Sequence, residues 1–181
     1  MNILDLLAEI KNAILRTEDE REVVAYKRLA AAENYAAEDV LSESTTVGTA
    51  FNFVNVVAKQ GGSGEIVGAQ VFMQTTALTP RLSLYLYKYT PTSALNDNVA
   101  NTAVSLADLP ISAGRIDFTA LEDLGGVSES IITTSTYGNL PVRFQCADDS
   151  RKLFGILVTR DAITGETVND RCEIRLRVRS L

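Results

Sequence analysis

The sequence of 181 residues contains no histidine and no tryptophan, and it contains only two cysteines. Histidine and cysteine supply much of the acid–base, nucleophilic and metal-binding chemistry of proteins. Their scarcity argues against an enzyme and against a metal centre, so we expect no catalytic activity, no bound metal and no other cofactor. Two cysteines are also too few for the disulfide framework that holds small secreted domains together.

Both cysteines lie in segments where apolar and polar residues alternate. Cys146 closes the run 142–146, and Cys172 opens the run 172–176. Each shares the parity of its apolar neighbours, so each side chain is expected to point into the protein. We predict two buried free thiols rather than a disulfide.

Acidic residues outnumber basic ones, 23 to 17, which gives a net charge of −6. Broad binding to nucleic acid needs an excess of positive charge, so this balance argues against it. No apolar run reaches the roughly 18 residues that a membrane span needs. The first residues lack a basic start and carry Asp5 and Glu9 within an apolar stretch, unlike a secretory signal. We expect a protein made in a cytoplasm, with neither nucleic acid nor a membrane as a partner.

The N-terminal residues 3–16 show the spacing of an amphipathic helix. Asn2 is in position to cap it, and Asp5 lies near the positive end of its dipole. A lone helix of about 14 residues is marginal in water, so its apolar stripe needs a partner. The stripe either packs on its own domain, or it contacts copies of the chain or another protein. The charged residues 18–22 separate it from the rest of the chain, which favours the second interpretation. The residues of the stripe are Ile3, Leu7, Ile10 and Ile14.

After the charged segment the hydrophobic period changes from near 3.6 to 2, which is typical of short strands with one dry face. Turn signals rich in glycine, asparagine and proline separate these strands. We therefore predict a mainly β protein, an antiparallel β-sandwich of jelly-roll or Greek-key type, preceded by a short N-terminal helix. Residues 1–20 form the helix and connector, and residues 21–181 form the sandwich domain. The predicted inward faces include Val67, Ala69, Val71 and Met73; Leu82, Leu84 and Leu86; and Cys172, Ile174, Leu176 and Val178.

Three loop-like segments carry residues that also occur in binding sites. The run 61–64, Gly-Gly-Ser-Gly, lacks the lysine and the following helix of a phosphate-binding loop, and we interpret it as a hairpin loop. The runs Asn-Asp-Asn at 96–98 and Asp-Asp at 148–149 lack the spacing of a calcium loop, and we interpret them as turns. The stretch 91–112 has little pattern. We predict that it is a surface crossover with a short helix or an extended segment near residues 104–109.

An arginine row stands out on the last predicted strand. Alternation places its members on one face, and arginine pairs well with carboxylates. The row is either a docking strip for an acidic partner or a solvated outer face balanced by acidic residues on the adjoining strand. Its members are Arg171, Arg175, Arg177 and Arg179.

A tyrosine row alternates with leucines on the strand that begins at Leu82. Tyrosine is favoured where a surface is half wet, so the row is either a platform for a sugar or a subunit, or it is buried beneath a loop. Its members are Tyr85, Tyr87 and Tyr89.

Several phrases along the chain resemble, in the same order, those of small virion proteins of tailed bacteriophages. The first is NYAAEDVLSESTT at 34–46, followed by the aromatic strand 51–57 and the glycine-rich turn 61–64. The others are TPRLSL at 79–84, the turn 96–98 and LFGILVTR at 153–160. The resemblance extends over roughly residues 22–180 and leaves out the N-terminal helix.

This resemblance is to phage capsid accessory proteins, called cement or decoration proteins, which bind outside the major shell as β-sandwich oligomers. It implies a virion subunit that is assembled in the host bacterial cytoplasm and located on the capsid surface. The major capsid protein would be its partner, and the chain would form a homo-oligomer, a dimer or trimer. The family offers no catalytic motif and no small-molecule substrate. The alternatives are another head–tail or tail component, a carbohydrate-binding module that uses the tyrosine row, and a hydrolase that needs two facing carboxylates.

Overall fold

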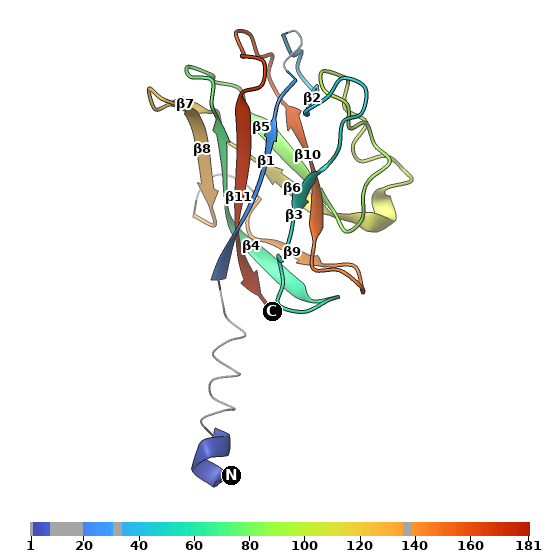
Figure 1. Ribbon diagram of the computed structural model, residues 1–181, viewed down its shortest axis with the longest axis vertical. Coiled ribbons are helices and arrows are strands. Elements are labelled where there is room, and N and C mark those ends of the chain that lie inside the picture. The colour runs from blue at the N-terminus through green and yellow to red at the C-terminus, as the bar shows by residue number, and fades with distance from the viewer. Residues whose placement is uncertain (1, 8–19, 31–33, 136–138) are drawn as a thin grey trace.

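Two antiparallel sheets packed face to face make up the body of the chain (Figure 1). The computed structural model describes residues 2–7, 20–30, 34–135 and 139–181. One sheet, here called the β11 sheet, has the order β1 (Glu20–Arg28), β11 (Arg171–Ser180), β4 (Ser63–Met73), β8 (Ser128–Thr133) and β7 (Glu122–Asp123). In this sheet β9 (Val142–Gln145) also pairs with β4.

The second sheet, here called the β10 sheet, has the order β2 (Val40–Leu41), β10 (Leu153–Thr159), β5 (Leu82–Tyr87) and β6 (Ser112–Asp117). The short strand β3 (Phe51–Phe53) pairs with β10 on the same edge as β2. A 3₁₀ turn, η1 (Leu109–Ile111), lies just before β6. These two sheets confirm the predicted mainly β, antiparallel sandwich.

The connectivity is that of a jelly roll. Strands β2 and β3 share one edge of β10, and β8 and β9 share one edge of β4, so each couple acts as one interrupted strand. With the short hairpin strand β7 set aside, eight principal strands pair from the outside inward. β1 pairs with β11, the couple β2 and β3 with β10, β4 with the couple β8 and β9, and β5 with β6. This nesting of antiparallel pairs across two sheets defines the jelly roll within the wider Greek-key class.

Alternation along the strands builds the core between the sheets. The leucines Leu82, Leu84 and Leu86 of β5 are fully buried, as are Ile174 and Leu176 of β11. Both cysteines are free and buried in this core, as predicted. Burial raises the pKa of the Cys146 thiol to about 11.

The predicted inward face made of Val67, Ala69, Val71 and Met73 is wrong at its first residue, Val67. The register between β11 and β4 shifts next to Val178, so that Val178 pairs with Ile66 while Arg177 pairs with Gly68. A β-bulge of this kind leaves one residue without a partner, here Val67, and reverses the parity on its far side. Ile66 is therefore the buried residue, and Val67 is half-buried.

The glycine-rich segment 61–64 is a turn that runs into the start of β4, and it is not a hairpin loop. Gly61 has a φ of 66°, the left-handed conformation that favours glycine, and the Gly62 N–H donates to the Lys59 carbonyl at 3.2 Å. The segment leads from β3 in the β10 sheet to β4 in the β11 sheet, so it joins the two layers of the sandwich.

The N-terminal segment begins as a capped helix. Residues 3–7 are helical, and the Asp5 N–H donates to Asn2 Oδ1 at 2.8 Å, while the Asn2 N–H donates to Asp5 Oδ2 at 3.2 Å. This reciprocal cap confirms the predicted helix start. Residues 8–16 of the predicted helix, including Ile10 and Ile14, lie outside the described residues. Strand β1 begins at Glu20, so the end of the predicted charged connector belongs to the sandwich.

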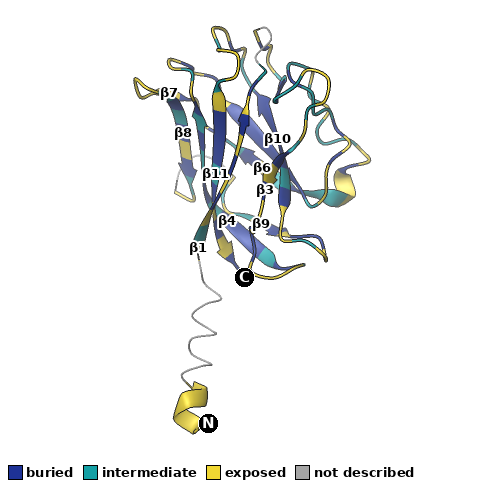
Figure 2. Cartoon of the chain, in the orientation of Figure 1, coloured by how far each residue is buried: buried dark blue, intermediate teal, exposed yellow. Residues whose placement is uncertain are grey.

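The crossover after β5 covers the outer face of the β10 sheet, which gives that sheet two dry faces (Figure 2). Val40, Tyr85, Tyr87, Ile156 and Val158 of the sheet form a second apolar cluster with partly buried residues of the crossover. For this reason all six residues of β5 are buried. The crossover residues that pack on the cluster are Ala94, Leu95, Val99, Ala103, Val104 and Ile111.

A single carboxylate ties this crossover together. Buried Asp108 accepts hydrogen bonds from the N–H and hydroxyl of Thr92, at 2.8 and 2.9 Å, and from the N–H and hydroxyl of Ser93, at 2.8 and 2.6 Å. Burial alone would raise the pKa of Asp108, but these donors outweigh it and hold the pKa well below its ordinary value.

We predict that Asp108→Asn destabilises the protein by about 2–4 kcal/mol, because an amide turns an N–H group toward donors that the carboxylate accepts from. Urea unfolding should report the loss. The control Asp149→Asn changes an exposed acidic residue and should stay within about 0.5 kcal/mol of the parent. Equal stability of the two variants would contradict the role assigned to Asp108.

Candidate functional site

The outer face of the β11 sheet is the surface that the crossover does not cover. It carries the predicted arginine row together with acidic and aromatic residues of β1, β4 and β8. We call it the arginine face. Its members are Glu22, Val24, Tyr26, Gln70, Phe72, Glu129, Ile131, Arg171, Glu173, Arg175, Arg177 and Arg179.

Glu173 lies between two arginines of the row on its own strand. Its carboxylate pairs with Arg171 at 2.5 Å and with Arg175 at 2.7 Å. Burial of Glu173 alone would raise its pKa, but the hydrogen bond from Arg175 and the two positive charges lower the pKa below its ordinary value. The Glu173 carboxylate therefore stays charged and holds both guanidinium groups in place.

Arg179, at the end of the row, pairs with acidic residues of both neighbouring strands. It lies 2.8 Å from Glu20 of β1 and 3.9 Å from Glu65 of β4, and Glu65 also contacts Arg143 at 3.3 Å. Arg175 approaches Glu22 of β1 at 3.9 Å. The second interpretation of the row, an outer face balanced by acidic residues on the adjoining strand, therefore describes Arg175 and Arg179, whereas Arg171 pairs with Glu173 of its own strand.

Two arginines of the row also stack on aromatic rings. The Arg171 guanidinium lies 4.0 Å from the centre of the Tyr26 ring, and the Arg175 guanidinium lies 5.0 Å from that of Phe72. Such pairs hold the rings and the charges in fixed positions on a flat surface. Sequence reasoning missed both aromatic residues, although their parity on β1 and β4 places them on the outer face.

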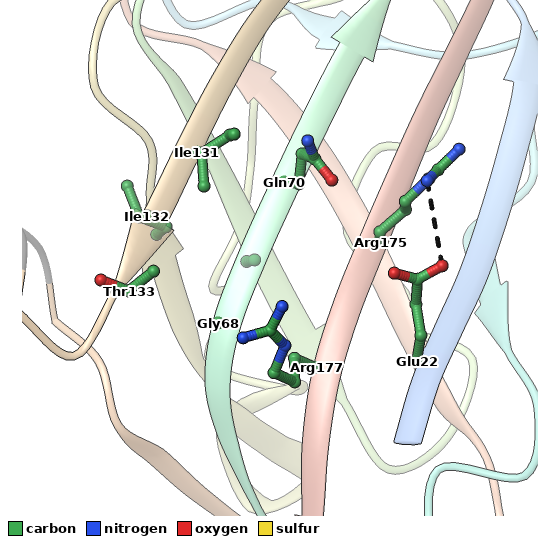
Figure 3. A pocket seen from close by; sticks show the side chains of 9 residues that line it. Glu22, Gly68, Gln70, Ile131, Ile132, Thr133, Arg175 and Arg177 are labelled. Atoms are coloured by element: carbon green, nitrogen blue, oxygen red, sulfur yellow. Dashed lines mark ion pairs between the residues drawn. The ribbon is translucent and has the colours of Figure 1, made fainter. Parts of the chain in front are cut away.

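Arg177 differs from the other three arginines because no ion pair reaches it within the described residues. It lies over Gly68, where the missing side chain leaves room, beside a hollow lined by Glu22, Gln70 and Ile131 (Figure 3). The hollow has a volume of about 60 Å³. This is far below the roughly 300 Å³ of an ordinary small-molecule site, so the feature suits a side chain of a partner protein or a few water molecules.

The tyrosine row is not a surface platform. Tyr85 and Tyr87 lie beneath the crossover with exposed fractions of 7% and 0%, and only Tyr89, at 49%, reaches solvent. Burial raises the pKa of Tyr87 to about 12. The prediction of an interface made by Tyr85 and Tyr87 is therefore wrong, because parity identifies residues on one face but does not tell whether another segment covers that face.

The described part of the N-terminal stripe is in solvent. Ile3 and Leu7 have exposed fractions of 77% and 55%, and neighbouring Leu4 and Leu6 are also exposed (Figure 2). These four residues do not pack on the sandwich of their own chain. For them, the interpretation that the stripe packs on its own domain is therefore wrong.

An ion pair between buried Lys27 and half-buried Glu43 fixes the end of β1 to the loop after β2. Lys27 points inward and donates to Glu43, to the Thr49 carbonyl and, at 3.2 Å, to the Ser42 hydroxyl. Burial alone would raise the pKa of Glu43, but hydrogen bonds from Lys27, Thr49 and Ser42 lower the pKa to about 2. Alternation along β1 places Lys27 on the inward face, where a charged side chain needs a partner. The sequence did not show that this partner is Glu43.

The structure brings three acidic residues, buried Asp97 and half-buried Glu166 and Asp170, near one another at the loop end of the sandwich. Asp97 Oδ1 accepts from the Tyr35 hydroxyl at 2.8 Å and from the Ser42 N–H at 2.7 Å, and Asp170 accepts from Thr75 at 2.6 Å. Both carboxyl oxygens of Glu166 are buried. Burial, together with the charges of Asp97 and Asp170, raises the pKa of Glu166 to about 8.

We predict that Glu166 makes the protein less stable as the pH rises from about 5 to about 8. Its pKa in the unfolded chain is near 4.5, so in this range the unfolded state releases a proton that the folded state keeps. Glu166→Gln should remove about 2–4 kcal/mol of this pH dependence, as seen in urea unfolding at both pH values. Glu122→Gln, at an exposed site on β7, is the control and should leave the slope unchanged.

Two further findings concern the described residues alone. They include no group of three or more histidine, cysteine, aspartate or glutamate side chains placed to hold a metal ion. Among them, no helix combines the length and the apolar character that crossing a bilayer demands.

Comparisons with known proteins place the chain in no family. No family model matches it, and no curated protein matches its sequence. Among solved structures, the X-ray structure of the Triatoma virus empty capsid aligns with 88% of this chain and 69% of its own, at 9% identity and a TM-score of 0.29. A structure of Triatoma virus aligns with 92% of this chain and 67% of its own, at 6% identity and a TM-score of 0.24. Similarity at this level establishes neither common descent nor a common function.

Proposed function

We propose that this chain is a structural virion protein, a cement or decoration subunit that binds the outer surface of a tailed-phage capsid through contacts with the major capsid protein. It acts by adhesion and carries out no catalysis. The observation that carries the proposal is the asymmetry of the sandwich. The chain covers the outer face of the β10 sheet with its own crossover and leaves the arginine face open.

The composition of the arginine face suits a protein partner. Arginine and aromatic residues are enriched at the centres of protein interfaces, and here Tyr26 and Phe72 are already held by Arg171 and Arg175. Glutamates form ion pairs with most of these arginines, so the face has no strong general attraction for polyanions. A partner would instead meet oriented hydrogen-bond donors and a flat apolar area. Arg177 supplies the available positive charge at its centre.

The resemblance of the ordered phrases between residues 22 and 180 to phage capsid accessory proteins gives the direction of the proposal. The jelly-roll connectivity is compatible with it, since this fold is common in capsid and lectin domains, although a fold alone does not define a function. A carbohydrate-binding role has lost its main support, because Tyr85 and Tyr87 are buried.

The N-terminal segment provides a second contact with the shell. Ile3, Leu4, Leu6 and Leu7 expose apolar side chains that a capsid groove would bury. Two modest contacts for each subunit, repeated over a shell, add up to strong attachment through multivalency.

We predict that the double variant Ile3→Glu with Leu7→Glu binds shells of the parent phage at least roughly tenfold more weakly, because two apolar side chains no longer leave water. Co-sedimentation with shells that lack this subunit measures the change. Leu106→Glu alters an equally exposed apolar residue, 85% accessible, on the crossover side, and should bind like the parent. Unchanged binding by the double variant would remove the N-terminal contact from the proposal.

We also predict that Arg177→Glu weakens shell binding, by roughly tenfold or more, since it reverses the charge of the one arginine of the row that has no ion pair within the described residues. Lys152→Glu makes the same charge change at an exposed site beside β10 and serves as the control. If both variants bind equally well, the arginine face is not the docking surface.

Cryo-electron microscopy of the particle separates the remaining candidates. Density for this jelly roll on the outer capsid lattice is the expected result. Density at the portal vertex or along the tail would replace the cement role by that of a head–tail or tail component. Absence from the particle would reject the proposal.

A further inference from the structure

The first strand of the β11 sheet has an open edge. The Arg171 carbonyl accepts from the N–H of Gln74, which follows β4, at 2.9 Å, so the backbone of Arg171 points away from β1. Leu29, just beyond the end of β1, donates its N–H to the Asp170 carbonyl at 3.0 Å, so the backbone of Leu29 points toward β11. Backbone groups alternate between the two sides of an antiparallel strand. Along β1, Arg21, Val23, Ala25 and Lys27 therefore bond to β11, and Glu22, Val24, Tyr26 and Arg28 direct their N–H and carbonyl groups to the open edge.

No backbone or side-chain hydrogen bond from elsewhere in the described chain reaches the outward N–H and carbonyl groups of Glu22, Val24 or Tyr26. The pairing of β1 with β11 runs without a bulge along all nine residues of β1, so the edge is long and regular. Long, regular edges of this kind are templates for pairing with another strand.

The other edges of the sandwich are shortened or blocked. At the far edge of the same sheet, β7 has two residues and leaves four residues of β8 beyond it, and β9 has four residues. In the β10 sheet, β2 and β3 have two and three. The edge of β6 is capped by Asn139, whose side-chain amide accepts from the Asp117 N–H at 3.1 Å and donates to the Arg115 carbonyl. β1 is thus distinguished from each of these edges by its length and by the absence of a cap within the described residues.

The side chains on the outer face of β1 form a self-complementary sequence. Glu20 and Glu22 stand at its start, exposed Val24 and Tyr26 in its middle, and Arg28 at its end. When such a strand meets an antiparallel copy of itself, acidic residues lie opposite basic ones and apolar residues lie opposite apolar ones.

We propose that two copies of this chain join through their β1 edges in an antiparallel pair with two-fold symmetry. In the register that the charges select, Glu22 lies opposite Arg28 of the second copy, Val24 opposite its Tyr26, and the two Ala25 residues meet at the axis. Pairs with outward backbone groups exchange two hydrogen bonds each. The two β11 sheets become continuous, and the two arginine faces form one surface.

This dimer stands on the geometry of β1 alone and does not depend on binding to a capsid. A self-pairing edge needs no other component, so its test takes place in a solution of the purified full-length chain. Failure of the dimer would leave the capsid role untouched, and failure of capsid binding would leave the dimer.

Cysteine cross-linking tests the register. Ala25 on the axis would face its symmetry mate with Cα atoms about 4.5 Å apart, within the range of a disulfide. Val23 would lie about 13 Å from its mate, which is too far. Under mild oxidation we expect Ala25→Cys to form a covalent dimer and Val23→Cys to remain unlinked. The parent chain, with its two native cysteines buried, is the background control.

Charge exchange provides a second test, read by sedimentation equilibrium. The parent should have twice the 19.6 kDa mass of one chain. Glu22→Arg or Arg28→Glu alone places like charges opposite each other at two symmetric positions, and should raise the dissociation constant roughly tenfold. The two changes together should restore the affinity. Glu122→Arg makes the same change as the first at the other edge of the sheet and should leave the mass unchanged.

A monomeric parent, equal cross-linking at residues 23 and 25, or a double variant as weak as the single ones would each overturn the proposal. Circular dichroism of every variant checks folding. If Ala25→Cys does not fold, the charge-exchange series decides alone, because its residues are on the outer face and outside the core.

Discussion

The packing of the crossover onto the outer face of the β10 sheet is the contact on which the remaining surface features depend. A sandwich of two sheets has two outer faces, and here the chain buries one of them with its own residues 94–111. The carboxylate of Asp108 holds the start of that segment by accepting four hydrogen bonds. Because the crossover covers one outer face, the arginine face is the outer sheet face that stays open among the described residues.

The arginine face combines strong charges with little net attraction. Glu173 forms ion pairs with two arginines on its own strand, and Glu20 and Glu65 both form ion pairs with Arg179. Ordered ion pairs of this type contribute little to stability at a surface, but they fix the directions in which hydrogen bonds are offered. This arrangement suits recognition of one folded partner and fits a chain whose overall charge is −6.

The two proposals, attachment to a large assembly and pairing of two chains, place different demands on a protein, and we assign them to different parts of this molecule. The N-terminal apolar residues and the arginine face offer side chains, whereas the edge of β1 offers backbone groups. A pair of chains linked through β1 would present both arginine faces side by side. Once one arginine face of such a pair has bound, the second face is held close to the assembly. Its binding is then an intramolecular step, so two faces of modest affinity together give a higher overall affinity.

Local patterns in the sequence determined the strand period, the sandwich class, the burial of Cys146 and Cys172 and the cap at Asn2, because each depends on neighbours within a few residues. The tertiary structure decided the rest. Parity placed Tyr85 and Tyr87 on one face, but only the path of the crossover buries them. The bulge at Val67 and the partner of Lys27 depend on strands and loops that are distant in the chain. Likewise, the arginines were visible in the sequence, whereas their glutamate partners on β1 and β4 became known only from the pairing of strands, since the alternation within one strand contains no information about which strand lies beside it.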